Sequence, residues 1–104
     1  MSTRDTYVRQ ISLLDGLSRE IESLQRQIDR DREDYHGQIG ALEANGFMGE
    51  YVTRLNDRYR LFSQLVDNMQ QYLNGCRKNI EEGHKVVIHN RIRAIDEADR
   101  NSAG

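Results

Sequence analysis

The sequence contains no proline, no tryptophan and a single cysteine, and its aromatic residues are five tyrosines and two phenylalanines. Without proline, nothing in the chain forces a helix to kink or stop. The few aromatic residues and the thin supply of large apolar side chains exclude a bulky globular core. The lone cysteine, Cys76, cannot form an internal disulfide, so we expect a fold that does not depend on an oxidising compartment.

Long hydrophobic runs are also missing. No stretch approaches the ~18 apolar residues that a membrane-spanning helix needs. Residues 1–7 include no apolar segment of the kind found in signal peptides, so we expect a protein that is made in the cytoplasm and has no cleavable leader. The net charge of −2 argues against nucleic acid as a partner, because that binding draws on a concentrated positive field.

What the chain does contain is a regular helical pattern. Charged residues make up 31% and hydrophobic residues 37%, a mixture typical of long amphipathic helices and coiled coils. Apolar residues recur every seven positions at Tyr7, Leu14, Ile21, Ile28, Tyr35 and Leu42. This repeat predicts a helix over residues 3–45. We interpret Leu17 and Leu24 as the second apolar position of each repeat, with Ile11 and Ile39 one residue beyond it.

A second apolar stripe follows Gly49 and predicts a helix over residues 50–98. Its members are three or four residues apart: Val52, Leu55, Tyr59, Phe62, Leu65 or Val66, Met69, Tyr72 or Leu73, Cys76 and Ile80. The stripe is wide enough to contact two neighbouring helices. Gly83 and the β-branched run at residues 86–88 weaken the helical preference. Residues 99–104 are predicted to be a disordered tail.

Between the two stripes lies Asn45-Gly46-Phe47-Met48-Gly49, which predicts a chain reversal at residues 46–49. The expected fold is therefore all-α, a single antiparallel two-helix hairpin. A hairpin of this length buries too little surface to offset the ordering of its backbone, so we expect it to dimerise into a four-helix bundle. The predicted partner interface consists of apolar residues from both stripes: Leu14, Leu17, Ile21, Leu24, Ile28, Tyr35, Leu55, Tyr59, Phe62, Val66, Met69 and Leu73.

No pattern of catalytic, cofactor-binding or metal-binding residues stands out. His84 and His89 are five residues apart and would point in different directions on a helix, and no zinc-binding motif is present. We interpret Cys76 as a small core residue, and we do not expect an enzyme.

Asp31 interrupts the first stripe within a fully charged run. It belongs either to a solvated helical face or to a contact with an arginine of a partner that fixes the pairing.

The position of Phe47 and Gly49 suggests a family. A chain of this length that forms two long helices, with an aromatic-X-Gly motif at the midpoint, resembles the WXG superfamily of type VII secretion. Phe47 stands where that family usually has tryptophan, and Gly49 matches its glycine. The Tyr-X-X-X-Asp/Glu motif that the family carries after its second helix is absent. The resemblance implies a helical partner, either a WXG-like protein or the N-terminal domain of an LXG-type toxin, and export without a cleavable signal peptide.

Two other interpretations remain open. Phe47 can simply plug the tip of the hairpin, with no role in secretion. The repeated heptads can also serve a self-assembling coiled-coil scaffold or adaptor, or a homodimer of this chain. A helical regulator that binds the coiled coil of another protein is a third option.

Overall fold

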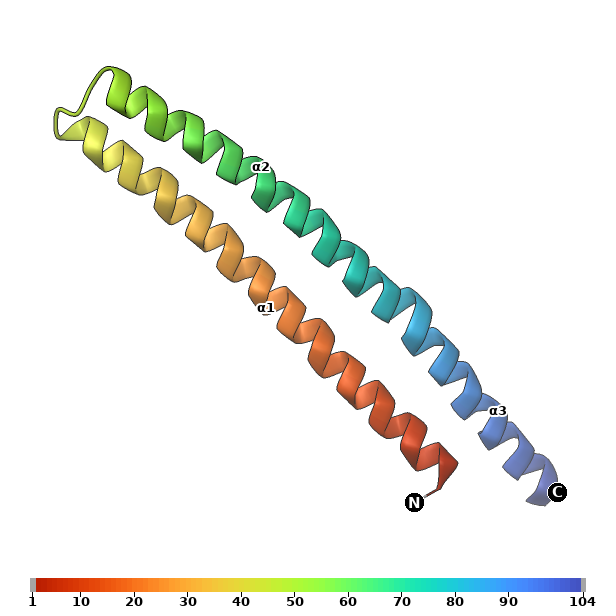
Figure 1. Cartoon of the computed structure of the whole chain (residues 1–104). Coiled ribbons are helices and arrows are strands. Elements are labelled where there is room, and N and C mark those ends of the chain that lie inside the picture. Colours follow the sequence, from red (N-terminus) through yellow and green to blue (C-terminus); the bar gives the residue numbers. More distant parts are fainter. Residues whose placement is uncertain (1, 104) are drawn as a thin grey trace. The chain divides into compact units, whose positions relative to one another are not determined.

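A computed structural model describes residues 2–103, and every regular element within them is a helix. Figure 1 shows α1 (Thr3–Ala44), α2 (Glu50–Lys78) and α3 (Lys85–Ala103). A six-residue π-helix, η1 (Asn79–His84), joins α2 to α3. The predicted all-α class with two long helical segments is confirmed. The chain divides into two compact units, residues 1–22 with 74–104 (unit 1) and Ser23–Leu73 (unit 2).

Unit 2 is a helical hairpin in which the second half of α1 runs antiparallel to most of α2 (Figure 1). The end of α1 has the hydrogen bonds of a Schellman motif: the N–H of Phe47 donates to the Leu42 carbonyl, and that of Gly46 donates to the Glu43 carbonyl. Gly46 has φ +92° and Gly49 has φ +80°, values that glycine adopts without strain. The predicted reversal therefore lies where these two glycines permit a left-handed backbone.

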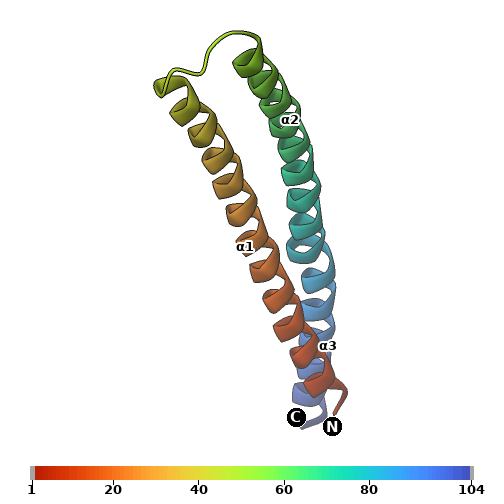
Figure 2. The ribbon, with the colours of Figure 1, turned by 60° about the vertical axis from the view of Figure 1, so that its left-hand side comes forward.

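In unit 1 the first half of α1 lies beside η1 and α3 (Figure 2). The first turn of α1 is capped by Ser2, whose Oγ accepts a 3.1 Å hydrogen bond from the backbone N–H of Asp5. Near this end, the Arg4 guanidinium lies 2.8 Å from a carboxylate oxygen of Asp96 in α3.

Four hydrophobic residues of the described chain are buried: Ile39 in α1, Val52 and Val66 in α2, and Ile80 in η1.

The π-helix explains the change of pattern that the sequence shows after Ile80. The inward positions of α2 and η1 recur every seven residues, at Val52, Tyr59, Val66, Leu73 and Ile80. The next apolar residue of this inward row is Ile88, eight positions further on. A π-turn accommodates one extra residue, so η1 absorbs the additional position and returns Ile88 to the inward side.

The helix bounds follow the predicted ones closely, except at the C-terminal end. The first helix ends at Ala44 and the second begins at Glu50, against predicted bounds of 45 and 50. The expected disordered tail is instead helical to Ala103, and Gly104 lies outside the described residues. No glycine or proline interrupts residues 99–103, and Arg100 in the last turn favours the helix by its charge. The expectation that all 104 residues form one hairpin stays a prediction.

Candidate interaction surface

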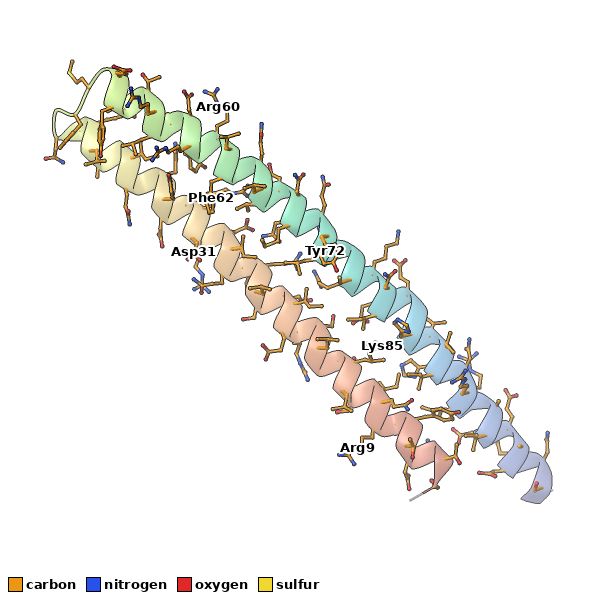
Figure 3. All side chains as sticks on the ribbon, in the orientation of Figure 1. Arg9, Asp31, Arg60, Phe62, Tyr72 and Lys85 are labelled. Carbon is orange, nitrogen blue, oxygen red and sulfur yellow. The ribbon has the colours of Figure 1, made fainter. Side chains whose placement is uncertain are left out.

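Aromatic rings fill the inward side of unit 2. The ring of Tyr35 in α1 stacks on Tyr59 and Phe62 of α2, with centroid separations of 5.7 and 5.3 Å. The imidazole of His36 also stacks on Tyr59, with a centroid separation of 4.8 Å. Figure 3 shows Phe62 between the two helices, whereas Arg60 points outward. Aromatic pairs of this kind contribute about 0.5–1.5 kcal/mol beyond the area that they bury.

Polar residues occupy alternate inward positions in unit 2, and sequence analysis missed them. Arg32 lies four residues after Ile28, and its guanidinium makes a 2.6 Å ion pair with Asp67 and a 3.4 Å hydrogen bond with Ser63. Two turns earlier in α1, the carbonyl of Gln25 accepts a 2.9 Å hydrogen bond from the Gln70 amide. The hydrogen bond to Asp67 raises the pKa of Arg32. Such directional contacts specify how the two helices align.

Unit 1 has the same arrangement, with an ion-pair cluster across the helices. The Lys85 ammonium lies 2.5 Å from an Asp15 oxygen and 2.8 Å from a Glu81 oxygen, and its side chain is 17% exposed. Figure 3 shows Lys85 directed between the helices. The hydrogen bonds to Asp15 and Glu81 raise the pKa of Lys85, and the hydrogen bond from Lys85 lowers the pKa of each carboxyl group. Beside them Ser18 is buried, and Arg77 pairs with Glu22.

These polar residues correct the predicted alignment of α1. The sequence analysis placed Leu17 and Leu24 at the second inward position, because it assumed that this position is apolar. The structure puts Ser18 and Gln25 there instead, while Leu17 is 51% and Leu24 49% exposed. Both leucines therefore lie on the flank of the helix pair in their own unit.

The residues predicted to meet a partner fall into two groups. Nine of them are buried or half-buried in the described chain: Leu14, Ile21, Ile28, Tyr35, Leu55, Tyr59, Phe62, Val66 and Leu73. The other three, Leu17, Leu24 and Met69, are about half exposed. The nine hold the chain's own helices together, and the three are available to a second molecule.

Each unit has further exposed apolar residues, which the sequence pattern did not assign to a partner. In unit 2, Leu61, Leu65 and Tyr72 are all more than 60% exposed. In unit 1, Leu13 is 65% exposed beside Leu17, and Val86 and Val87 are each close to half exposed. Their sequence signal was the pairing of adjacent apolar residues, such as Leu65 with Val66 and Leu13 with Leu14, of which only one can face inward.

The turn carries a smaller apolar surface. Phe47 is 49% exposed, Met48 is 79% exposed and Tyr51 is 58% exposed. The rings of Phe47 and Tyr51 lie 6.2 Å apart and are tilted by 40°. The Phe47 side chain therefore touches the start of α2 and also remains available to another molecule.

The described residues also bear on metal binding, redox chemistry and membrane spanning. Within residues 2–103 no group of three or more His, Cys, Asp and Glu side chains could hold a metal ion. The thiol of Cys76 is free, and the residue is half-buried in α2. None of the helices in the described part of the chain has the length and apolar character to cross a membrane.

Searches against models of protein families, curated proteins and solved structures found no match to this chain.

Proposed function

We propose that the chain is a helix-pairing module of a type VII secretion system, acting as a secreted WXG-like substrate or as the targeting partner of a larger effector toxin. Its helical partner covers the exposed apolar residues and completes a four-helix bundle. The observation that carries the proposal is the combination of a long helical chain with Phe47 and Gly49 in the turn between α1 and α2.

The exposed apolar residues support the pairing part of this proposal. Leu17, Leu24 and Met69 are each about half exposed, and Leu13, Leu65 and Tyr72 are more exposed still. Exposed apolar residues of this kind mark interaction sites in soluble proteins. The helices already present offer rigid ridges, against which the stripe of another amphipathic helix can pack. The helical N-terminal domain of an LXG-type toxin is a partner of this kind.

The turn supports the secretion part. Phe47, the aromatic residue of the Phe-X-Gly motif, is half exposed, so its ring is accessible to another molecule. Gly49 has a positive φ, a conformation that explains why glycine is needed there whatever the function. The exposure of Phe47 supports a role in recognition, and Gly49 also has a structural role in the turn.

The alternative is a self-assembling coiled-coil scaffold or adaptor with no role in secretion. One observation favours it: Leu61 is 63% exposed on α2. It lies five residues before Val66, and therefore on a different side of α2 from that inward residue. Apolar residues on more than one side of a helix suit an assembly with several neighbours.

A secretion assay separates the two functions. The tagged chain is expressed in a bacterium with a working type VII system, together with Phe47→Ala and the adjacent control Met48→Ala. Because both side chains are substantially exposed, both variants should keep the helical circular dichroism of the parent. We expect Phe47→Ala to reduce export at least tenfold and Met48→Ala to leave it unchanged. Absence of export for the parent would reject the substrate role, and equal export of all three chains would reject recognition through Phe47.

A further inference from the structure

A row of side chains on α1 in unit 1 lies outside the helix pair already described. Arg9, Leu13 and Leu17 follow one another at four-residue intervals, and Glu20 lies three residues further, so all four share one side of the helix. We call this row the Leu13 ridge. Leu13 is 65% exposed and Leu17 is 51% exposed. In Figure 3 the Arg9 side chain points away from α3.

The Leu13 ridge borders an apolar groove of about 510 Å³ between α1 and the η1–α3 segment. Its lining residues are Gln10, Leu13, Leu14, Leu17, Ile80, His84 and Ile88. Only Gln10 and His84 among them carry polar side chains. The groove can therefore receive apolar side chains from a helix laid along the ridge.

We propose that the occupant is a second copy of this chain, whose Leu13 ridge packs antiparallel on the first about a two-fold axis between Leu13 and Leu17. This inference rests on the proposed pairing function and names the partner and the surface. In that arrangement each Leu13 meets Leu17 of the partner subunit, so the two-fold axis makes this contact twice and covers both leucines of each copy.

The charges of the ridge match in the same alignment. An axis midway between positions 13 and 17 sets Arg9 one residue from the level of Glu20 of the partner subunit, about 1.5 Å along the helix. The two side chains are long enough to pair across that offset, and symmetry makes the pair twice. Neither Arg9 nor Glu20 has an ion pair within the described chain. In a parallel alignment Arg9 would face another Arg9 and Glu20 another Glu20.

Gly16 lies next to the axis and permits a close approach of the two helices. A Cβ added to Gly16 would meet no atom within 4 Å in the chain itself, so the space beside it is open. Glycine at this point lets the backbone of a second helix come near.

The exposed area is also sufficient. A compact monomer of 12.1 kDa exposes about 6,000 Å², whereas this chain exposes 7877 Å². Stable interfaces remove about 1,200–2,000 Å² in total, or half that from each partner. The excess of about 1,900 Å² is thus large enough to supply one such interface and leave surface for other contacts.

Size-exclusion chromatography with light scattering on the purified chain tests the self-pairing. We expect a dimer for the parent chain. Leu13→Asp should raise the dimer dissociation constant at least tenfold. The matched control is Leu61→Asp, at a leucine that is 63% exposed in unit 2, and it should leave the dimer intact. Circular dichroism of both variants checks that the helices persist.

Disulfide cross-linking tests the alignment, in a Cys76→Ser background that removes the native thiol. A mixture of Leu13→Cys and Leu17→Cys chains should form a cross-linked dimer under mild oxidation. Leu13→Cys alone should cross-link poorly, because the two introduced thiols would lie four residues apart, about 6 Å along the axis. Efficient cross-linking of Leu13→Cys alone would show a parallel pair and overturn the proposal.

Charge reversal tests the ion pairs. Arg9→Glu and Glu20→Arg should each weaken the dimer about tenfold, since two pairs are lost and two like-charge contacts appear. The double variant should restore the parental dissociation constant.

A monomeric parent chain, or a dimer whose dissociation constant is unchanged by Leu13→Asp, would overturn the proposal. A monomer that still co-purifies with a larger helical protein would refute self-pairing and leave the proposed function standing.

Discussion

Ile80 and Ile88 line one groove together with Leu14, although eight residues separate them along the chain. Eight residues do not fit the seven-residue repeat that the rest of the inward stripe follows. The π-helical segment η1 lies between them and takes up the additional position. The π-turn is therefore the means by which α3 keeps its apolar side toward α1 in unit 1.

Deletion of Gly83 tests this relationship. Removing the extra residue should convert η1 into regular α-helix and leave Ile88 facing inward. It also removes a poor helix former, so we expect a gain in unfolding free energy of about 0.5–1 kcal/mol, measured by urea denaturation. The control deletion is Gly37, in the regular part of α1, where every inward residue on one side would turn away. A loss of stability on deleting Gly83 as large as that on deleting Gly37 would contradict the explanation.

Replacement of Ile21 by aspartate tests which side of α1 faces inward. Ile21 is half-buried and belongs to the seven-residue repeat, so a carboxylate there would be partly desolvated between the helices. We expect a loss of about 2–4 kcal/mol in unfolding free energy, and most of the helical circular dichroism with it. Ser23→Asp, at an exposed position two residues on, is the control. Unchanged helicity in Ile21→Asp would show that the inward side is assigned wrongly.

The two inward rows of α1 differ in how clearly the sequence reveals them. The repeat of Leu14, Ile21, Ile28 and Tyr35 identified one inward row of α1 correctly, because an apolar period of seven has one natural alignment. The other row has Ile11 and Ile39 at its ends, but the residues between them, Ser18, Gln25 and Arg32, are polar and carry no hydrophobic signal. Its residues are inward because Arg32 meets Asp67 and Gln25 meets Gln70, and only coordinates reveal contacts between residues so far apart in the chain.

The assignment of twelve residues to a partner interface stays a prediction. Three of them, Leu17, Leu24 and Met69, are about half exposed within their own units. The sequence does contain a signal for the π-helix, because Ile80 and Ile88 are eight residues apart rather than seven. The step is recognised as one extra residue only because the seven-residue spacing resumes from Ile88 to Ile95. The helical end at residues 99–103 was missed because a polar sequence without apolar periodicity does not exclude helix.

The ion-pair cluster at Lys85 predicts an acid-dependent loss of stability. The pKa values of Asp15 and Glu81 are lowered in the folded chain by hydrogen bonds from Lys85. Their contribution is therefore present above the unfolded-state values of about 4, and it is lost as the pH falls through the lower folded-state values. We expect the thermal midpoint to drop on acidification below about pH 4.

Two variants isolate the cause of that acid dependence. Lys85→Met removes the ammonium group and Asp15→Asn removes one of its partners, so each should make the acid dependence shallower. The double variant should behave like Lys85→Met alone, because the contact is already gone. Thermal unfolding followed by circular dichroism between pH 2 and pH 7 measures it. A profile that is equally steep in Lys85→Met would assign the acid sensitivity to other carboxylates.

The turn between α1 and α2 offers a matched pair of glycine substitutions. Gly46 has φ +92°, in the left-handed region, whereas Gly37 lies in the regular part of α1. An added Cβ would meet no atom within 4 Å at either position, so the backbone conformation is the main difference between them. Gly46→Ala should cost about 1–2 kcal/mol in unfolding free energy, the penalty of left-handed backbone for a residue with a Cβ. Gly37→Ala should gain about 0.5–1 kcal/mol through helix propensity. Urea denaturation of the two variants measures both, and equal effects of the same sign would show that the chain does not reverse through a left-handed Gly46.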